Sequence, residues 1–66
     1  MQIIFNQKPV EVEEGASVLS ALTLFGVPMQ HIAVAVNKQI VRRDEWDSKI
    51  LKENDDIMVI TAVKGG

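Results

Sequence analysis

The sequence predicts an α+β fold, a four- to five-stranded mixed sheet with one main helix packed on one face. Three observations support this prediction. Apolar residues alternate with period two near both ends of the chain, one stretch of helical spacing lies between them, and 66 residues leave room for a single domain. A hairpin followed by a right-handed crossover would place the first and last strands side by side.

The first part of the chain predicts a hairpin and then the helix. Residues 1–6 alternate and predict the first strand. Pro9 lacks an N–H, so a second strand should begin there, lie at the sheet edge and include Val12. Ser17 is the expected N-cap of the helix, and Gly26 suits its C-terminal end. The apolar residues at helical spacing between them are Val18, Ala21, Leu22 and Phe25.

The second half of the chain predicts the remaining strands. Residues 31–36 alternate as a third strand, and Asn37-Lys38 predicts a tight turn into a short continuation at residues 40–41.

A charged stretch then crosses to the last strand. Residues 42–49 surround Trp46 and predict an irregular segment with one helical turn, and the Trp46 ring is expected to cover the small core. Residues 54–56 predict a turn and residues 57–63 the last strand. We therefore expect one domain over residues 1–63.

Composition excludes several classes of function. Seven basic against nine acidic residues give a net charge of −2, which argues against nucleic acid as a partner. The sequence has no cysteine and a single histidine, His31, so we expect no disulfide, no catalytic thiol and no metal site. The apolar run 32–36 is too short to span a membrane, and no leader is visible after Met1. A cytoplasmic location without membrane contact is expected.

No arrangement of residues predicts catalysis. One histidine cannot supply a credible nucleophilic triad, and there is no glycine-rich phosphate loop. Neighbouring carboxylates are more typical of a solvated surface than of an acid–base pair. They could nevertheless form an acidic docking patch, whose members would be Asp44, Glu45, Asp47, Glu53, Asp55 and Asp56.

The C-terminal residues are the unusual feature. The predicted last strand is followed by Lys64-Gly65-Gly66, which we expect to form a flexible tail over residues 64–66. An extended stretch from Val63 to Gly66 reaches roughly 13 Å at about 3.3 Å per residue. Because glycine has no side chain, such a tail could pass through a narrow channel. It would present its terminal carboxylate, which is ionised at neutral pH, as a nucleophile.

The whole chain resembles the ubiquitin-like β-grasp family, and within it the ThiS/MoaD family of sulfur carriers. The resemblance is carried by the opening Met1–Asn6, by Gly15 with Ser17-Val18, by residues 36–41, by Arg43 with Trp46, and by the final Gly65-Gly66. Lys64 departs from the small or neutral residue that is usual before these glycines, which bears on the choice of partner.

The resemblance implies a carrier rather than an enzyme, with no bound cofactor. An E1-like adenylyltransferase of the ThiF type would use ATP to adenylate the Gly66 carboxylate, while Gly65 and Lys64 would help it recognise the tail. Sulfur from a persulfide donor would then convert Gly66 to a thiocarboxylate. A thiazole synthase of the ThiG type would take this sulfur for the thiamine thiazole ring.

Other functions remain open on the sequence. Within the same fold, the chain could be a molybdopterin-synthase small subunit or a ubiquitin-like protein modifier. From another class, it could be a passive β-grasp interaction module that makes no use of its C-terminus.

The alternation of the last strand predicts a partner-binding surface. If Ile57, Val59 and Thr61 face the helix, the residues that alternate with them face solvent on the open side of the sheet. A contiguous apolar patch on so small a domain is typical of an interface, although it could also be a plain sheet surface or a weak homodimer contact. Its predicted members are Ile4, Met58, Ile60 and Ala62, extended at low height by Ala33 and Ala35.

Overall fold

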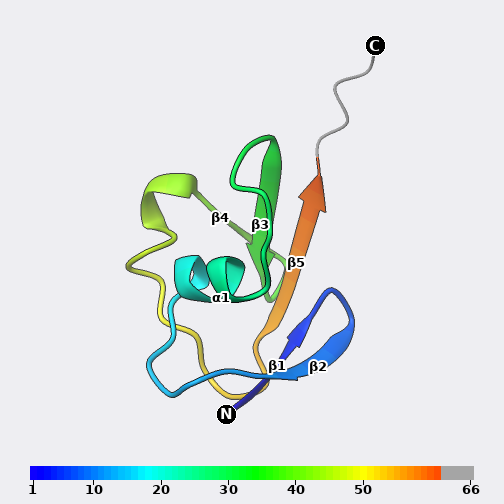
Figure 1. The fold of residues 1–66 in the computed structure, drawn as a ribbon, viewed down its shortest axis with the longest axis vertical. Helices are drawn as coiled ribbons and strands as arrows, with labels where there is room; N and C mark the ends of the chain where they lie inside the picture. Colours follow the sequence, from blue (N-terminus) through cyan, green and yellow to red (C-terminus); the bar gives the residue numbers. More distant parts are fainter. Residues whose placement is uncertain (62–66) are drawn as a thin grey trace.

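A computed structural model of the protein describes residues 1–61 and shows a five-stranded mixed sheet with one helix. Figure 1 shows α1 lying across one face of the sheet. The strands are arranged in the order β2-β1-β5-β3-β4. The elements are β1 (Gln2–Phe5), β2 (Lys8–Glu11), α1 (Val18–Leu24), β3 (Ile32–Val36), β4 (Gln39–Val41), the 3-10 turn η1 (Arg43–Glu45) and β5 (Asp56–Thr61).

The first and last strands are adjacent, as the sequence predicts. β1 and β5 run parallel at the centre of the sheet, with Ile4 opposite Asp56 and Phe5 opposite Ile57. The other three strand pairs are antiparallel. The predicted α+β class with its mixed sheet is therefore confirmed.

Strand boundaries differ by a residue or so from the sequence prediction, and those of β2, β3 and β5 have a local cause or consequence. β2 begins at Lys8 rather than Pro9, because Asn6 and Gln7 form a two-residue turn with φ angles of 49° and 71°. It ends before Val12, while Pro9 lies on an edge strand as expected. β3 begins one residue late, since His31 has a φ of 62° and cannot extend the strand. β5 begins one residue early, at Asp56.

Helix α1 is closed at both ends by local hydrogen bonds. Ser17 and Ser20 form a reciprocal capping box, with Ser17 Oγ accepting from Ser20 N at 3.1 Å and Ser20 Oγ accepting from Ser17 N at 2.8 Å. At the other end Gly26, with a φ of 69°, donates to the Thr23 carbonyl oxygen, and Val27 donates to that of Leu22. This pair of bonds is a Schellman motif, so the predicted cap and stop are both confirmed.

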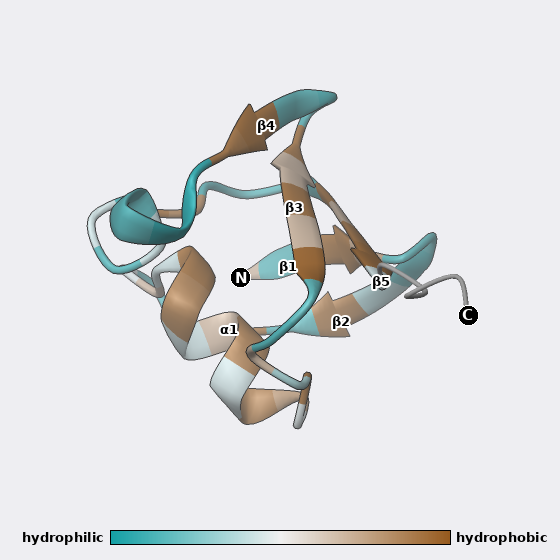
Figure 2. Cartoon of the chain, turned by 90° about the horizontal axis from the view of Figure 1, so that it is seen from above, coloured by the Kyte–Doolittle hydropathy of each residue, from teal (hydrophilic) through white to brown (hydrophobic). Residues whose placement is uncertain are grey.

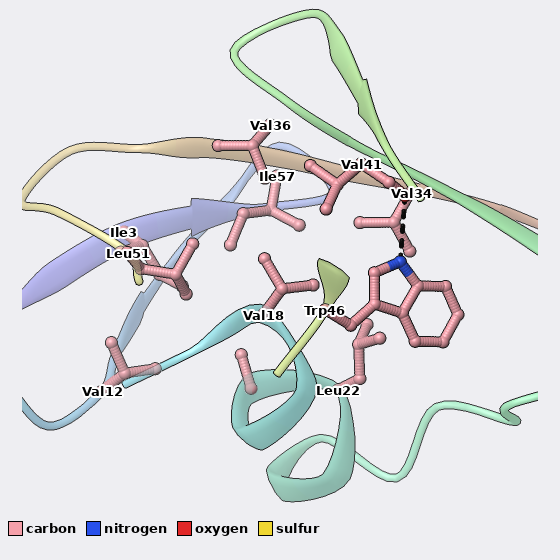
Figure 3. Close-up of a cluster of buried hydrophobic side chains, with 11 residues drawn as sticks. Ile3, Val12, Val18, Leu22, Val34, Val36, Val41, Trp46, Leu51 and Ile57 are labelled. Atoms are coloured by element: carbon pink, nitrogen blue, oxygen red, sulfur yellow. Dashed lines mark hydrogen bonds between the residues drawn. The ribbon is translucent and has the colours of Figure 1, made fainter. Parts of the chain in front are cut away.

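The core fills the space between α1 and the sheet, and Trp46 covers its end next to η1 (Figure 3). The Trp46 side chain is 4% exposed, and its indole N–H donates to the Val41 carbonyl oxygen at 3.0 Å. The Arg43 guanidinium lies 5.4 Å from the Trp46 ring centroid and donates to the Met29 carbonyl oxygen. The largest fully buried side chains are those of Ile3, Val18, Leu22, Val34 and Ile57.

Asp55 does not belong to an acidic surface patch, which corrects the sequence prediction. It is 9% exposed, and its carboxylate accepts from Asn37 Nδ2 at 3.0 Å and from Lys52 N at 2.8 Å. Asn37 Oδ1 in turn accepts from Asp56 N at 3.0 Å. The side chain of Asn37 therefore joins the β3–β4 turn to the start of β5.

Replacing Asn37 with glycine tests how much this connection stabilises the fold. Glycine adopts the φ of 52° at this position without strain, so Asn37→Gly removes the two side-chain hydrogen bonds and little else. We expect it to lower the free energy of unfolding by about 2 kcal/mol more than Lys38→Gly, the matched control in the same turn. Urea denaturation of both variants measures the difference, and equal losses would contradict a role for the Asn37 side chain.

Candidate functional site: the open face of the sheet

The residues of β5 alternate between the core and the face of the sheet opposite α1. Ile57 is 1% exposed and Val59 packs against the core, whereas Ile60 is 56% exposed and Met58 is half-buried. The structure thus places Met58 and Ile60 on the open face, as the alternation predicts.

The register of the neighbouring strands brings further apolar residues to the same face. Ala33 lies opposite Ile60, and Ala35 lies opposite Met58. On the other side of β3, Ile40 lies opposite Ala35 and is 68% exposed. We define the open-face patch as Ile4, Ala33, Ala35, Ile40, Met58 and Ile60.

Ile40 is the member of this patch that the sequence analysis left out. The tight turn at residues 37–38 could have indicated its position. A two-residue turn pairs Val36 with Gln39 and therefore Ala35 with Ile40, which places both on the same face. In Figure 2 hydrophilic colour marks this turn and the start of β4, and hydrophobic colour covers the remainder of the strand. The patch therefore extends to the edge of the sheet.

Ile4 lies at the opposite end of the patch from Ile60. Its partner on β5 is Asp56, four residues before Ile60, which corresponds to about 13 Å along a strand. Ile4 is half-buried, and Pro9 lies opposite it on β2. The open face is thus apolar toward the C-terminal end of β5 and carries the carboxylate of Asp56 toward its N-terminal end.

The patch lies beside the point where the described chain ends. Ile60 and Thr61 are the last described residues of β5, and Thr61 lies opposite Ile32 on β3. The other predicted site residues, Ala62, Lys64, Gly65 and Gly66, lie outside the described residues. The role of the patch in binding and that of the C-terminus in chemistry stay predictions.

The described residues contain no cluster suited to metal binding. No group of three or more His, Asp or Glu side chains within residues 1–61 is placed to hold a metal ion. His31 is exposed on the loop that precedes β3. In the same part of the chain, no helix has the length and apolar character needed to cross a bilayer.

Known sequences resemble the chain over its whole length. The sequence model of the ThiS family matches residues 3–66. The sulfur carrier protein ThiS of Escherichia coli K12 is 32% identical over 66 residues, which is the full length of both chains. A thiazole synthase of Magnetococcus marinus is also 32% identical over the whole chain, which here covers 20% of the longer protein.

Solved structures show the same arrangement of strands and helix. The crystal structure of the thiamine biosynthesis protein ThiS from Geobacter metallireducens superposes with a TM-score of 0.86, at 25% identity and with full coverage of both chains. A solution NMR structure of a thiamine biosynthesis protein from that organism gives a TM-score of 0.78 at 25% identity, covering all of this chain and 88% of the other. The chain therefore belongs to the ThiS family and has its ubiquitin-like β-grasp fold.

Proposed function

We propose that this protein is a sulfur carrier of thiamine biosynthesis, with its sulfur held as a thiocarboxylate at Gly66. The observation that carries the proposal is the family match over residues 3–66, which includes the terminal Gly65-Gly66. The full-length similarity to the E. coli sulfur carrier supports it further. On this proposal the protein is a substrate of other enzymes and has no catalytic residues of its own.

Activation of the terminal carboxylate is the step that needs ATP. A carboxylate is a poor electrophile, so an E1-like adenylyltransferase would let a Gly66 oxygen attack the α-phosphorus of ATP and expel pyrophosphate. The resulting acyl adenylate has AMP as a good leaving group. A persulfide sulfur then attacks the acyl carbon, and a second thiol cleaves the acyl disulfide to release the thiocarboxylate.

The open-face patch is the surface by which the adenylyltransferase would hold the carrier. Ile40 and Ile60 are both more than half exposed, and Ala33 and Ala35 between the larger side chains keep this part of the face low. An apolar protein surface of complementary shape would gain free energy by covering them. Because Ile60 lies one residue before the end of β5, an enzyme that covers the patch would hold the carrier next to the start of its last five residues.

The proposed acceptor of the sulfur is a thiazole synthase. A stretch resembling the whole of this chain occurs within the thiazole synthase of Magnetococcus marinus. Covalent linkage raises the effective concentration of two domains for each other. Their occurrence in one polypeptide therefore supports the idea that the two domains act together. We propose that this carrier serves an enzyme of the same kind.

Thiocarboxylate formation is measurable as a change in intact mass. Incubation with ATP, the cognate adenylyltransferase and a persulfide donor is expected to raise the mass by about 16 Da, the difference between sulfur and oxygen. A variant lacking Gly65-Gly66 should stay folded and show no increase. No mass change with an activator validated on another carrier would contradict the proposal. Thiol-resistant adducts on lysine would instead indicate a protein modifier, and unchanged activity of the truncated variant a passive module.

Charge substitution on the open face tests the docking surface. Ile60→Asp and Ile40→Asp are each expected to weaken binding to the adenylyltransferase about tenfold or more, because an apolar contact would then bury a carboxylate. Ile50→Asp is the matched control, since Ile50 is 50% exposed but pairs with Ser17 beside α1. Calorimetric titration measures the affinities, and thermal unfolding checks that all three variants fold. Equal affinities for the three would show that the enzyme binds elsewhere.

Salt dependence tests the proposed contribution of Lys64 to tail recognition. If its ammonium group is attracted to acidic residues of the adenylyltransferase, Lys64→Ala should slow association at low ionic strength and have little effect at high ionic strength. Stopped-flow measurements of the association rate at several salt concentrations provide this comparison. An effect that does not change with salt, or no effect, would remove Lys64 from the proposed interaction.

A further inference from the structure

A groove of about 560 Å³ lies along α1, on the side of the sheet opposite the open-face patch. It is formed between α1 and the segment that joins β2 to α1, which passes beside the helix in Figure 1. Its apolar lining comes from both elements. The residues are Val12, Ala16, Ala21 and Leu24.

Part of this apolar lining is accessible to a partner. Val12 and Ala21 are 6% and 2% exposed and belong to the core, whereas Leu24 is 64% exposed. Ala16 is half-buried, so its exposed fraction lies between that of the two core residues and that of Leu24. The groove thus offers a large accessible leucine next to small side chains, which leaves room for an apolar side chain from another molecule.

The rim of the groove is acidic. Glu13 and Glu14 both line it and are both exposed, and no lysine or arginine is among the lining residues. A third acid of the lining, Glu11, is paired with the N-terminal ammonium group at 3.2 Å. Within residues 1–61, neither Glu13 nor Glu14 forms an ion pair. The negative potential beside the apolar surface is therefore not neutralised by neighbouring described side chains.

These features favour a peptide segment over a small molecule. Small-molecule sites usually place a few polar groups inside the pocket to orient the ligand. Across the described chain, every buried side-chain nitrogen and oxygen atom already has a hydrogen-bond partner. The charged groups of this groove are exposed carboxylates at its rim, which suit flexible cationic side chains.

We propose that the groove binds a basic amphipathic segment of a partner protein. An apolar side chain of the segment packs against Leu24 and Ala16, while lysine or arginine side chains pair with Glu13 and Glu14. The alkyl stems of these cations add contact with the apolar lining. The charges mainly speed association, and the apolar contact supplies the complementary shape.

This surface is independent of the one that the sulfur-carrier proposal uses. The open-face patch lies on one side of the sheet and the groove on the other, so both can be occupied at once. One protein could therefore hold the carrier through the groove while the adenylyltransferase or the sulfur acceptor covers the open face.

Amide NMR titration of the ¹⁵N-labelled protein tests the proposal. The probe is a synthetic ten-residue peptide in which leucine alternates with lysine, and the control peptide replaces lysine with glutamate. We expect the basic peptide to shift amide signals of residues 13–16 and of Leu24, with little change at Ile40 and Ile60. The acidic peptide should cause no such shifts, because it is repelled by the rim.

Variants separate the groove from general electrostatic attraction. The double variant Glu13→Gln/Glu14→Gln is expected to weaken binding of the basic peptide about fivefold or more, whereas Asp44→Asn/Asp47→Asn, which removes the same charge near η1, should not. Leu24→Ser should also weaken binding without altering the charge. The proposal is overturned if the peptide shifts the open face instead, if the two double variants behave alike, if Leu24→Ser has no effect, or if no binding occurs at millimolar peptide.

Discussion

The parallel pairing of β1 with β5 is the constraint on which the rest of the fold depends. The Ile4 N–H donates to the Asp55 carbonyl oxygen at 2.8 Å, and Asn6 N–H donates to that of Ile57 at 2.9 Å. Asn6 also accepts from the Val59 N–H through its side chain, across 53 residues of sequence. Because the first and last strands meet at the centre of the sheet, the core closes only when nearly all of the segment between them is in place.

Local chemistry explains why much of this fold can be predicted from the sequence. The alternation of β5, the serine cap of α1 and Gly26 at its end are determined by residues within a few positions of one another. The start of β2 at Lys8 rather than at Pro9 was not predicted, because Gln7 is an uncommon residue at positive φ and a two-residue turn is therefore hard to recognise here.

Features set by distant residues could not be predicted in the same way. Asp55 is buried because Asn37, 18 residues earlier, supplies a hydrogen bond to its carboxylate. The outward position of Ile40 follows from strand register, and the groove beside Leu24 exists only once the β2–α1 segment packs along the helix. For the candidate site, the alternation of β5 correctly predicted that Met58 and Ile60 lie on the open face. The protein that binds them cannot be predicted in this way, because its surface is not encoded in this sequence.

The central place of β5 also has a mechanical consequence. A force applied at Thr61 along the strand is parallel to the sheet, so it loads the hydrogen bonds to β1 and to β3 together in shear. Rupture in shear requires many bonds to fail at once, whereas an edge strand pulled sideways can be peeled away one bond at a time. The sheet therefore resists unfolding when the chain beyond Thr61 is pulled away from the domain.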